Sequence, residues 1–124
     1  MGFDRTYLVW ALAYVALGMG LGINMAASHD HAQHVTHAHI LLVGFVVSFI
    51  YAVIHKLWLG EKTSRLARVQ LIAHQVGALM MISGLFLLYG GFVPEEQIER
   101  LLAPSTIIVF IAALLMIVMV LKKR

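Results

Sequence analysis

Five of the seven histidines lie within eleven residues between two long apolar segments, and they are the side chains best suited to chemistry. The possible ligands in this cluster are His29, Asp30, His31, His34, His37 and His39. Imidazole binds zinc, copper, iron and haem iron, and a carboxylate adds a hard oxygen ligand. Ionisable groups at a bilayer surface usually serve a function. The cluster therefore predicts a membrane protein that binds a metal or a metal-containing cofactor.

The composition is that of a protein built for the lipid bilayer. Hydrophobic residues make up 61% of the 124 residues, charged residues only 12%, and the mean hydropathy is +0.90. The length fits a single domain over residues 1–124. The absence of cysteine excludes disulfides, thiolate zinc sites and cysteine-ligated iron–sulfur clusters within this chain. The net charge of +3 comes from basic residues at segment ends, which favours membrane topology over binding to nucleic acid.

Four apolar segments are long enough to cross about 30 Å of hydrocarbon. They cover residues 7–25, 37–58, 66–89 and 105–121. The first is longer than the apolar region of a signal peptide, so we expect it to remain as a span. Pro94 and the acidic residues after it predict a short interfacial helix, and Pro104 is expected to separate that helix from the last span. We expect an all-α membrane four-helix bundle.

The basic residues predict its orientation. The middle connection and the C-terminus carry Lys56, Lys62, Arg65, Arg68, Lys122, Lys123 and Arg124. The histidine loop has no Lys or Arg, and the third loop has one Arg against three Glu. The positive-inside rule then places both termini in the cytoplasm and the histidine cluster on the opposite side. That side is the periplasm if the protein lies in a bacterial inner membrane.

In each of the first three segments, helical spacing places polar and small residues on one face of the expected helix. The faces comprise Tyr14, Gly18, Leu21, Met25 and His29, then His37, Leu41, Gly44, Ser48, Tyr51 and His55, then Gln70, His74, Gly77, Met81, Gly84 and Leu88. Antiparallel packing about a turn near Glu61 would place Ser48 level with His74 and Tyr51 level with Gln70. The alternatives for His74 are a hydrogen bond to Ser48 or a carbonyl, an axial ligand, or a member of a proton relay. His55 is expected to be a solvated interfacial histidine.

The spacing within the cluster separates its histidines into groups. His37 and His39 point about 200° apart on a helix, so they are expected to serve two sites or two neighbours. His34 with His37, or His31 with His34, have the i,i+3 spacing that can chelate one ion. A solvated histidine-rich loop without a ligand would also explain His31 and His34. It explains His37 and His39 poorly, because they stand at the start of an apolar helix.

Three motifs carry a resemblance to a known family. They are Ala27-Ser28-His29-Asp30, the run from His37-Ala38-His39 to Gly44-Phe45 and Tyr51, and His74-Gln75-Val76-Gly77. Together they resemble small bacterial membrane proteins described as haem–copper oxidase subunit-I-like. The second motif and the helix after it also resemble part of the catalytic subunit of C-type oxidases and nitric oxide reductases.

The resemblance implies roles for two histidines. In the large oxidases the first histidine of the motif binds the active-site haem and the second binds the low-spin haem. These two histidines correspond to His37 and His39. The copper ligands and the second low-spin haem ligand come from earlier helices that have no counterpart here. The chain alone therefore lacks a complete oxygen- or nitric-oxide-reducing centre. A second axial ligand would come from His29, His74 or another subunit, and a homodimer would supply one.

The leading prediction is a membrane protein that binds haem b and acts in electron transfer, haem handling or sensing. Its expected ligands are His37 and His39, then His29 and His74, and the surfaces of Gly18, Gly22 and Gly44 are expected to open a slot for the haem. The alternative is a zinc, copper or iron site made by His29, Asp30, His37 and His39 with help from His31 and His34, where Met25 would favour copper(I). A third hypothesis is a non-catalytic assembly partner in a respiratory complex.

Overall fold

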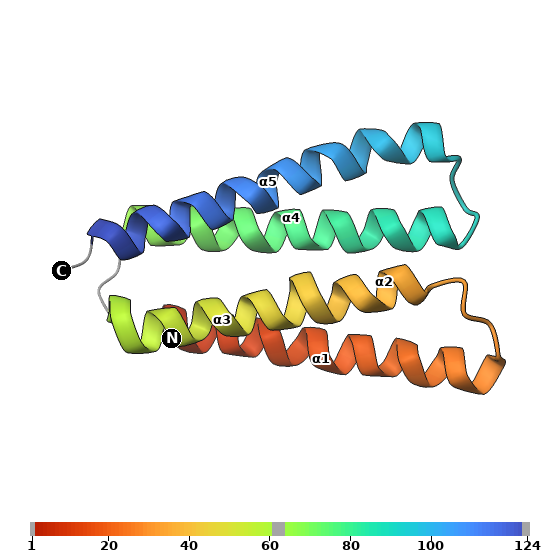
Figure 1. Ribbon diagram of the computed structural model, residues 1–124, viewed down its shortest axis with the longest axis horizontal. Coiled ribbons are helices and arrows are strands. Elements are labelled where there is room, and N and C mark those ends of the chain that lie inside the picture. Colours follow the sequence, from red (N-terminus) through yellow and green to blue (C-terminus); the bar gives the residue numbers. More distant parts are fainter. Residues whose placement is uncertain (1, 61–63, 123–124) are drawn as a thin grey trace.

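The computed structural model describes residues 2–60 and 64–122, and all regular secondary structure in this part of the chain is helical. The helices are α1 (Phe3–Ser28), α2 (His34–His39), η1 (Ile40–Val46), α3 (Val47–Ile54), η2 (His55–Leu59), α4 (Arg65–Tyr89) and α5 (Glu95–Lys122) (Figure 1). Because α2, η1, α3 and η2 follow one another without a break, they form one span. Four spans are thus long and apolar enough to cross a membrane, as expected. The chain has the fold of a multi-pass membrane protein.

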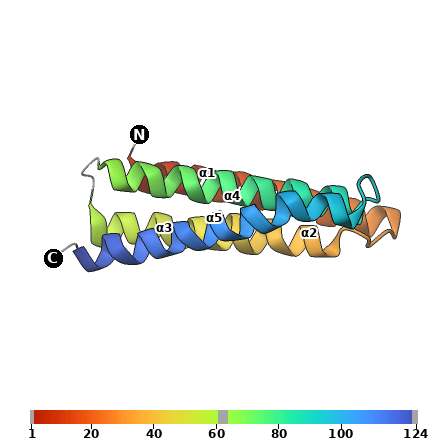
Figure 2. The same cartoon turned by 90° about the horizontal axis from the view of Figure 1, so that it is seen from above.

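The spans form two antiparallel hairpins that lie side by side. One hairpin pairs α1 with the span from α2 to η2, and the other pairs α4 with α5 (Figures 1 and 2). We call the end with Phe3, Leu59, Arg65 and Lys122 the terminal end, since both chain termini lie there (Figure 1). The opposite end, with the loops after Ser28 and Tyr89, is the loop end. The predicted turn at Glu61 and the basic residues Lys62, Lys123 and Arg124 lie outside the described residues.

Glycines allow the two helices of the first hairpin to touch. A Cβ at Gly18 would come 2.6 Å from Leu41 Cδ2, and one at Gly44 would come 2.6 Å from the Tyr14 ring. A Cβ at Gly22 would come 2.9 Å from Cε1 of His37. Small residues at helix contacts let the backbones approach closely. The expectation that these three glycines open a slot is therefore wrong, because neighbouring side chains fill the space beside each of them.

The last span differs from the prediction at its start. The predicted interfacial helix and the predicted break at Pro104 are wrong, because α5 continues from Glu95 to Lys122 with Pro104 inside it. Proline removes one backbone donor, and nearby hydroxyls often support the helix at such a turn. Here the hydroxyls of Ser105 and Thr106 both donate to the carbonyl of Leu102, at 2.7 and 3.0 Å. These two bonds tie the side chains after the proline to the helix backbone, while the carbonyl that loses its donor to the proline is that of Arg100.

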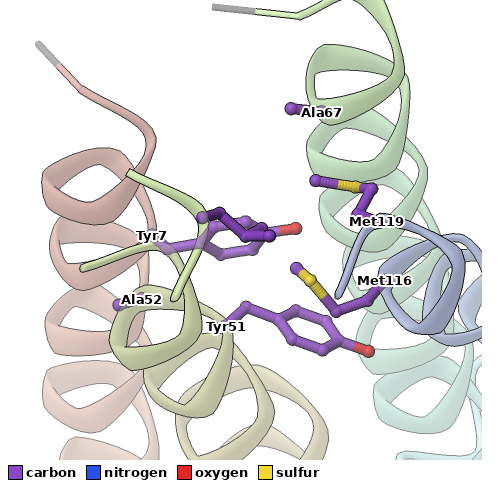
Figure 3. Packing of buried hydrophobic residues seen from close by; sticks show 7 residues of the cluster. Tyr7, Tyr51, Ala52, Ala67, Met116 and Met119 are labelled. Carbon is purple, nitrogen blue, oxygen red and sulfur yellow. The ribbon is translucent and has the colours of Figure 1, made fainter. Parts of the chain in front are cut away.

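The buried side chains form two clusters along the bundle. The cluster near the terminal end contains Tyr7, Tyr51, Ala52, Leu59, Ala67, Met116 and Met119. Its two tyrosine rings extend from α1 and α3 toward the two methionines of α5 (Figure 3). The second cluster, toward the loop end, contains Tyr14, Ile40, Ala78 and Ile82. Lipid-facing apolar side chains such as Leu12, Ile23 and Phe110 remain exposed on the outside.

Candidate functional site

His37 is held in a fixed orientation at the contact between α1 and α2. Its Nδ1 lies 2.8 Å from the carbonyl oxygen of Gly18, and a carbonyl can only accept, so Nδ1 is the donor. In the neutral ring Nε2 then keeps its lone pair. The ring is half-buried and lies against Gly22, one turn along α1 from Gly18. His37 is therefore a pre-oriented imidazole with one nitrogen available as a ligand.

His39 is oriented by its own helix. Its Nδ1 donates to the carbonyl of Val35 at 2.8 Å, and the ring is half-buried. Its Nε2 also keeps a lone pair in the neutral form. The two residues lie within one α-helix, so their side chains diverge by about 200°, as the spacing indicated. One chain thus offers two separate ligand atoms at the loop end.

The other members of the cluster are more exposed. His29 ends α1 in the left-handed conformation with φ of 57°, and His31, His34 and Asp30 lie in or beside the loop. Nδ1 of His34 donates to the carbonyl of His31 at 3.1 Å, and Asp30 accepts from the backbone N–H of Ala32 at 3.0 Å. Within residues 2–60 and 64–122, no three His, Asp or Glu side chains come together as a metal site.

Two apolar grooves flank the contact between α1 and the second span. One, of about 450 Å³, is lined by Ala16, Leu17, Gly20, Leu21, Thr36, Ile40, Ile82, Ser83 and Phe86. The other, of about 420 Å³, is lined by Val15, Met19, Ala38, Leu41, Leu42, Phe45 and Val46. The residues on either side of His37 thus line one groove each. Pockets of this size and apolar character suit hydrophobic ligands.

His74 lies away from this surface, in the middle of the bundle. It is fully buried, about nine residues or 14 Å along α4 from the terminal end. Tyr51 meets its ring edge-on at a centroid distance of 5.1 Å, and Tyr7 lies at 6.3 Å. Neither ring nitrogen makes a well-formed hydrogen bond among the described residues, but the backbone of Val43 lies close enough to act on the ring, so the predicted bond to a carbonyl stays open. A haem could reach this imidazole only if the helices separated.

The predicted hydrogen bond from His74 to Ser48 is wrong, because Ser48 binds a neighbouring residue instead. The Ser48 hydroxyl accepts from Nε2 of Gln75 at 3.2 Å, and Oε1 of Gln75 accepts from the Tyr14 hydroxyl at 2.7 Å. The bond from Gln75 places Ser48 within one residue of its predicted level beside His74, and the ring of Tyr51 also reaches His74.

Gln70 connects three helices at the next level toward the terminal end. Its Oε1 accepts from the Tyr7 hydroxyl of α1, and its Nε2 donates to the carbonyl of Ala112 of α5 at 3.1 Å. Neither Tyr7 nor Gln75 belonged to the predicted helical faces, although Gln75 stands in the motif His74-Gln75-Val76-Gly77. Tyr7 stands seven residues before Tyr14, so the helical face of the first span extended by two turns would have included it. The only feature of Gln75 in the sequence that indicated a buried hydrogen bond was its polar side chain within an apolar segment.

His55 is buried at the terminal end, in contrast to the solvated interfacial position expected for it. Its side chain is 2% exposed and stacks on Phe3 and Tyr7, at centroid distances of 5.2 and 5.7 Å. Its Nε2 has no hydrogen-bond partner in the part of the chain that the structure describes. Aromatic residues of α1 thus cover this imidazole, a feature that the spacing within its own helix does not reveal.

Comparisons with known protein families, curated proteins and solved structures found no match.

Proposed function

We propose that this protein binds haem b in the membrane, with His37 as the principal axial ligand, and acts in electron transfer, haem handling or sensing. The hydrogen bond from Nδ1 of His37 to the carbonyl of Gly18 carries the proposal. Ligating histidines commonly donate their second nitrogen to a carbonyl or carboxylate, which fixes the ring and raises its basicity. His37 has this arrangement before any ligand binds, and its Nε2 is left to bind iron.

The number of protein ligands favours haem over a non-haem metal. A structural zinc site takes four protein ligands, and a catalytic zinc site takes three. Haem iron needs only one or two ligands from the protein, because the porphyrin macrocycle fills its equatorial positions. The described residues bring no three His, Asp or Glu side chains together, but they present single oriented imidazoles. The two apolar grooves are lined by the neighbours of His37, Thr36 and Ala38, and not by its ring, and their apolar walls suit the faces of the haem macrocycle. The zinc, copper or iron site therefore has less support, and it remains a prediction.

A homodimer would complete the ligand set. His37 and His39 diverge on one helix, so one haem iron is not expected to bind both residues of a single chain. A second copy placed against the same groove would bring a second imidazole and cover exposed apolar side chains such as Leu42 and Met19. In that arrangement the haem supplies one-electron redox chemistry, and the groove residues keep water from the macrocycle.

The charge distribution supports the orientation. Among the described residues, all Lys and Arg except Arg100 lie at the terminal end, and the loop end carries Glu95, Glu96 and Glu99 beside Arg100. Positive charge marks the cytoplasmic side of membrane proteins. We place the terminal end in the cytoplasm and the histidine cluster outside, on the periplasmic side of a bacterial inner membrane, in keeping with the oxidase-like resemblance.

The test is a visible absorption spectrum of the detergent-purified protein, oxidised and then reduced with dithionite, with elemental analysis of the same sample. We expect a Soret band, sharpened α and β bands on reduction, and iron near stoichiometric amounts. His37→Gly should remove most of the haem, and added imidazole should restore the spectrum. His31→Gln is the matched control, since His31 lies exposed in the loop and does not orient His37.

Two results would contradict the proposal. A colourless protein that carries zinc, copper or iron would move the site to the His29–Asp30–His37–His39 set. A colourless protein without metal would favour the assembly-partner hypothesis, in which the histidines contact another subunit of a respiratory complex.

A further inference from the structure

A pocket at the terminal end lies between the second span and the two helices of the other hairpin. Its volume of about 320 Å³ is within the size range of ligand-binding pockets. It is lined by His55, Leu59, Ser64, Leu66, Ala67, Met119 and Lys122. None of these described residues is acidic, and Asp4 of the same end lines a different pocket together with Arg5 and Lys56. The pocket therefore combines a positive charge with an apolar wall.

The start of α4 lines one side of this pocket. Ser64 is the N-cap residue, and its hydroxyl accepts from the backbone N–H of Ala67 at 2.9 Å. The first N–H groups of a helix have no partner within the helix, so those of Arg65 and Leu66 can donate to a ligand. Phosphate groups bind to helix starts in this way. The start of α4 thus favours a ligand with acceptor oxygens.

The imidazole of His55 gives a second, independent indication of a ligand. Its side chain is 2% exposed and lines the pocket, and its Nε2 is buried without a hydrogen-bond partner among the described residues. A buried polar atom without a partner costs about 1–3 kcal/mol. In the tautomer with the proton on Nε2 the ring is a donor, as the helix start is. An oxygen of a bound ligand would be the missing acceptor.

The charge of Lys122 decides the sign of the ligand. Helices α1 and α4 begin at the terminal end, and η2 and α5 end there. The partial charges of about +0.5 at a helix start and −0.5 at a helix end therefore offset one another. Among the described lining residues, the ammonium of Lys122 is the full charge that remains. The pocket consequently favours an anion.

The depth of the pocket indicates where such an anion comes from. The second span ends at Leu59 and α4 begins at Arg65, so the pocket lies at the level of the lipid headgroups. The exposed ring of Trp58 marks the same level, since tryptophan is enriched at the membrane interface. The side chains of Leu66 and Met119 give the pocket a wall that suits the beginning of an acyl chain. Basic pockets between membrane helices bind anionic headgroups.

We infer that this pocket binds the phosphate group of an anionic phospholipid, with Lys122, the first N–H groups of α4 and His55 as its donors. The lipid is held by charge and hydrogen bonds, and no covalent bond forms or breaks. The site lies at the opposite end of the bundle from the histidine cluster and uses no residue of the proposed haem site. The two proposals can therefore be tested separately.

The experiment measures thermal unfolding of the full chain in a neutral detergent while phosphatidylglycerol, phosphatidylcholine or inorganic phosphate is added. We expect phosphatidylglycerol to raise the unfolding temperature to a plateau, and the other two additions to raise it much less. Lys122→Gln and His55→Phe should each increase the phosphatidylglycerol concentration at half-effect at least tenfold. The phenylalanine keeps a ring beside Phe3 and Tyr7 and removes the donor. Lys56→Gln is the matched control, because it removes the same charge from the same end at a different pocket.

Three results would overturn the proposal. An equal loss in Lys122→Gln and Lys56→Gln would show only the general attraction of a basic surface for anionic lipid. An equal response to phosphatidylcholine would show that the pocket does not select an anion. A full shift with inorganic phosphate alone would assign the pocket to a soluble phosphate compound in place of a lipid. Lys122 is exposed near the end of α5, so its substitution gives a result even if His55→Phe does not fold.

Discussion

The imidazole of His37 lies against Gly22 of the neighbouring helix, so closely that a Cβ at position 22 would come 2.9 Å from its Cε1. The same ring donates its Nδ1 proton to the carbonyl of Gly18. The glycine is therefore part of the site, because its missing side chain gives the ring the space in which it reaches that carbonyl.

We expect Gly22→Ala to weaken haem binding by about 10- to 100-fold, the usual effect of disturbing a group that orients a ligating histidine. The measurement is a haem titration of the purified protein, followed by the Soret band. Ile23→Ala is the control, since Ile23 is exposed on the same helix and lines neither of the two grooves. Equal affinity in both variants would show that the position of His37 does not matter for binding.

Gly44 should tolerate a side chain as poorly as Gly22, with an effect on stability instead of binding. A Cβ there would come 2.6 Å from the ring of Tyr14, which is buried and hydrogen-bonded to Gln75. Since this ring has little freedom to move, we expect Gly44→Ala to destabilise the fold by about 1–3 kcal/mol. Thermal unfolding in detergent measures the change, and Gly20→Ala should be neutral or slightly stabilising.

Gln70→Leu removes one of the polar residues that connect the two hairpins. It leaves the Tyr7 hydroxyl without its partner, at a cost of about 1–3 kcal/mol, whereas the Ala112 carbonyl keeps the backbone hydrogen bond of its own helix. We expect a clear loss of stability in unfolding by denaturant in detergent micelles. Gln97→Leu, on an exposed position of α5, should change the stability much less. A similar small effect at both positions would mean that the buried amide contributes little.

Ser105 and Thr106 should matter for the helix around Pro104. Replacing both with Ala removes two hydroxyl donors to the carbonyl of Leu102, and hydrogen bonds of this kind contribute about 0.5–1.5 kcal/mol each. We expect a lower unfolding temperature with the overall helix content retained, as measured by circular dichroism. A loss of helix content would instead show that the hydroxyls are required for the helix to pass the proline.

The amino-acid sequence alone determined the number of spans and the positions of the histidines along them. Apolar runs of this length form helices in lipid because every backbone group must be hydrogen-bonded within its own segment. The break predicted at Pro104 was wrong, because one proline removes a single backbone hydrogen bond and α5 stays packed against α4 as one helix. Helical spacing also showed that His37 and His39 diverge, since that angle depends only on the local helix geometry.

Only the tertiary structure decided which residues meet across helices. The sequence could not place the Gly18 carbonyl beside His37, nor Gln75 beside Ser48 and Tyr14, because the relative register of two helices depends on how all their side chains pack. For the same reason the sequence could not show that the rings of Tyr7 and Tyr51 pack between those of His55 and His74. Local geometry sets the direction of each side chain from its own helix, and packing between helices sets its partners.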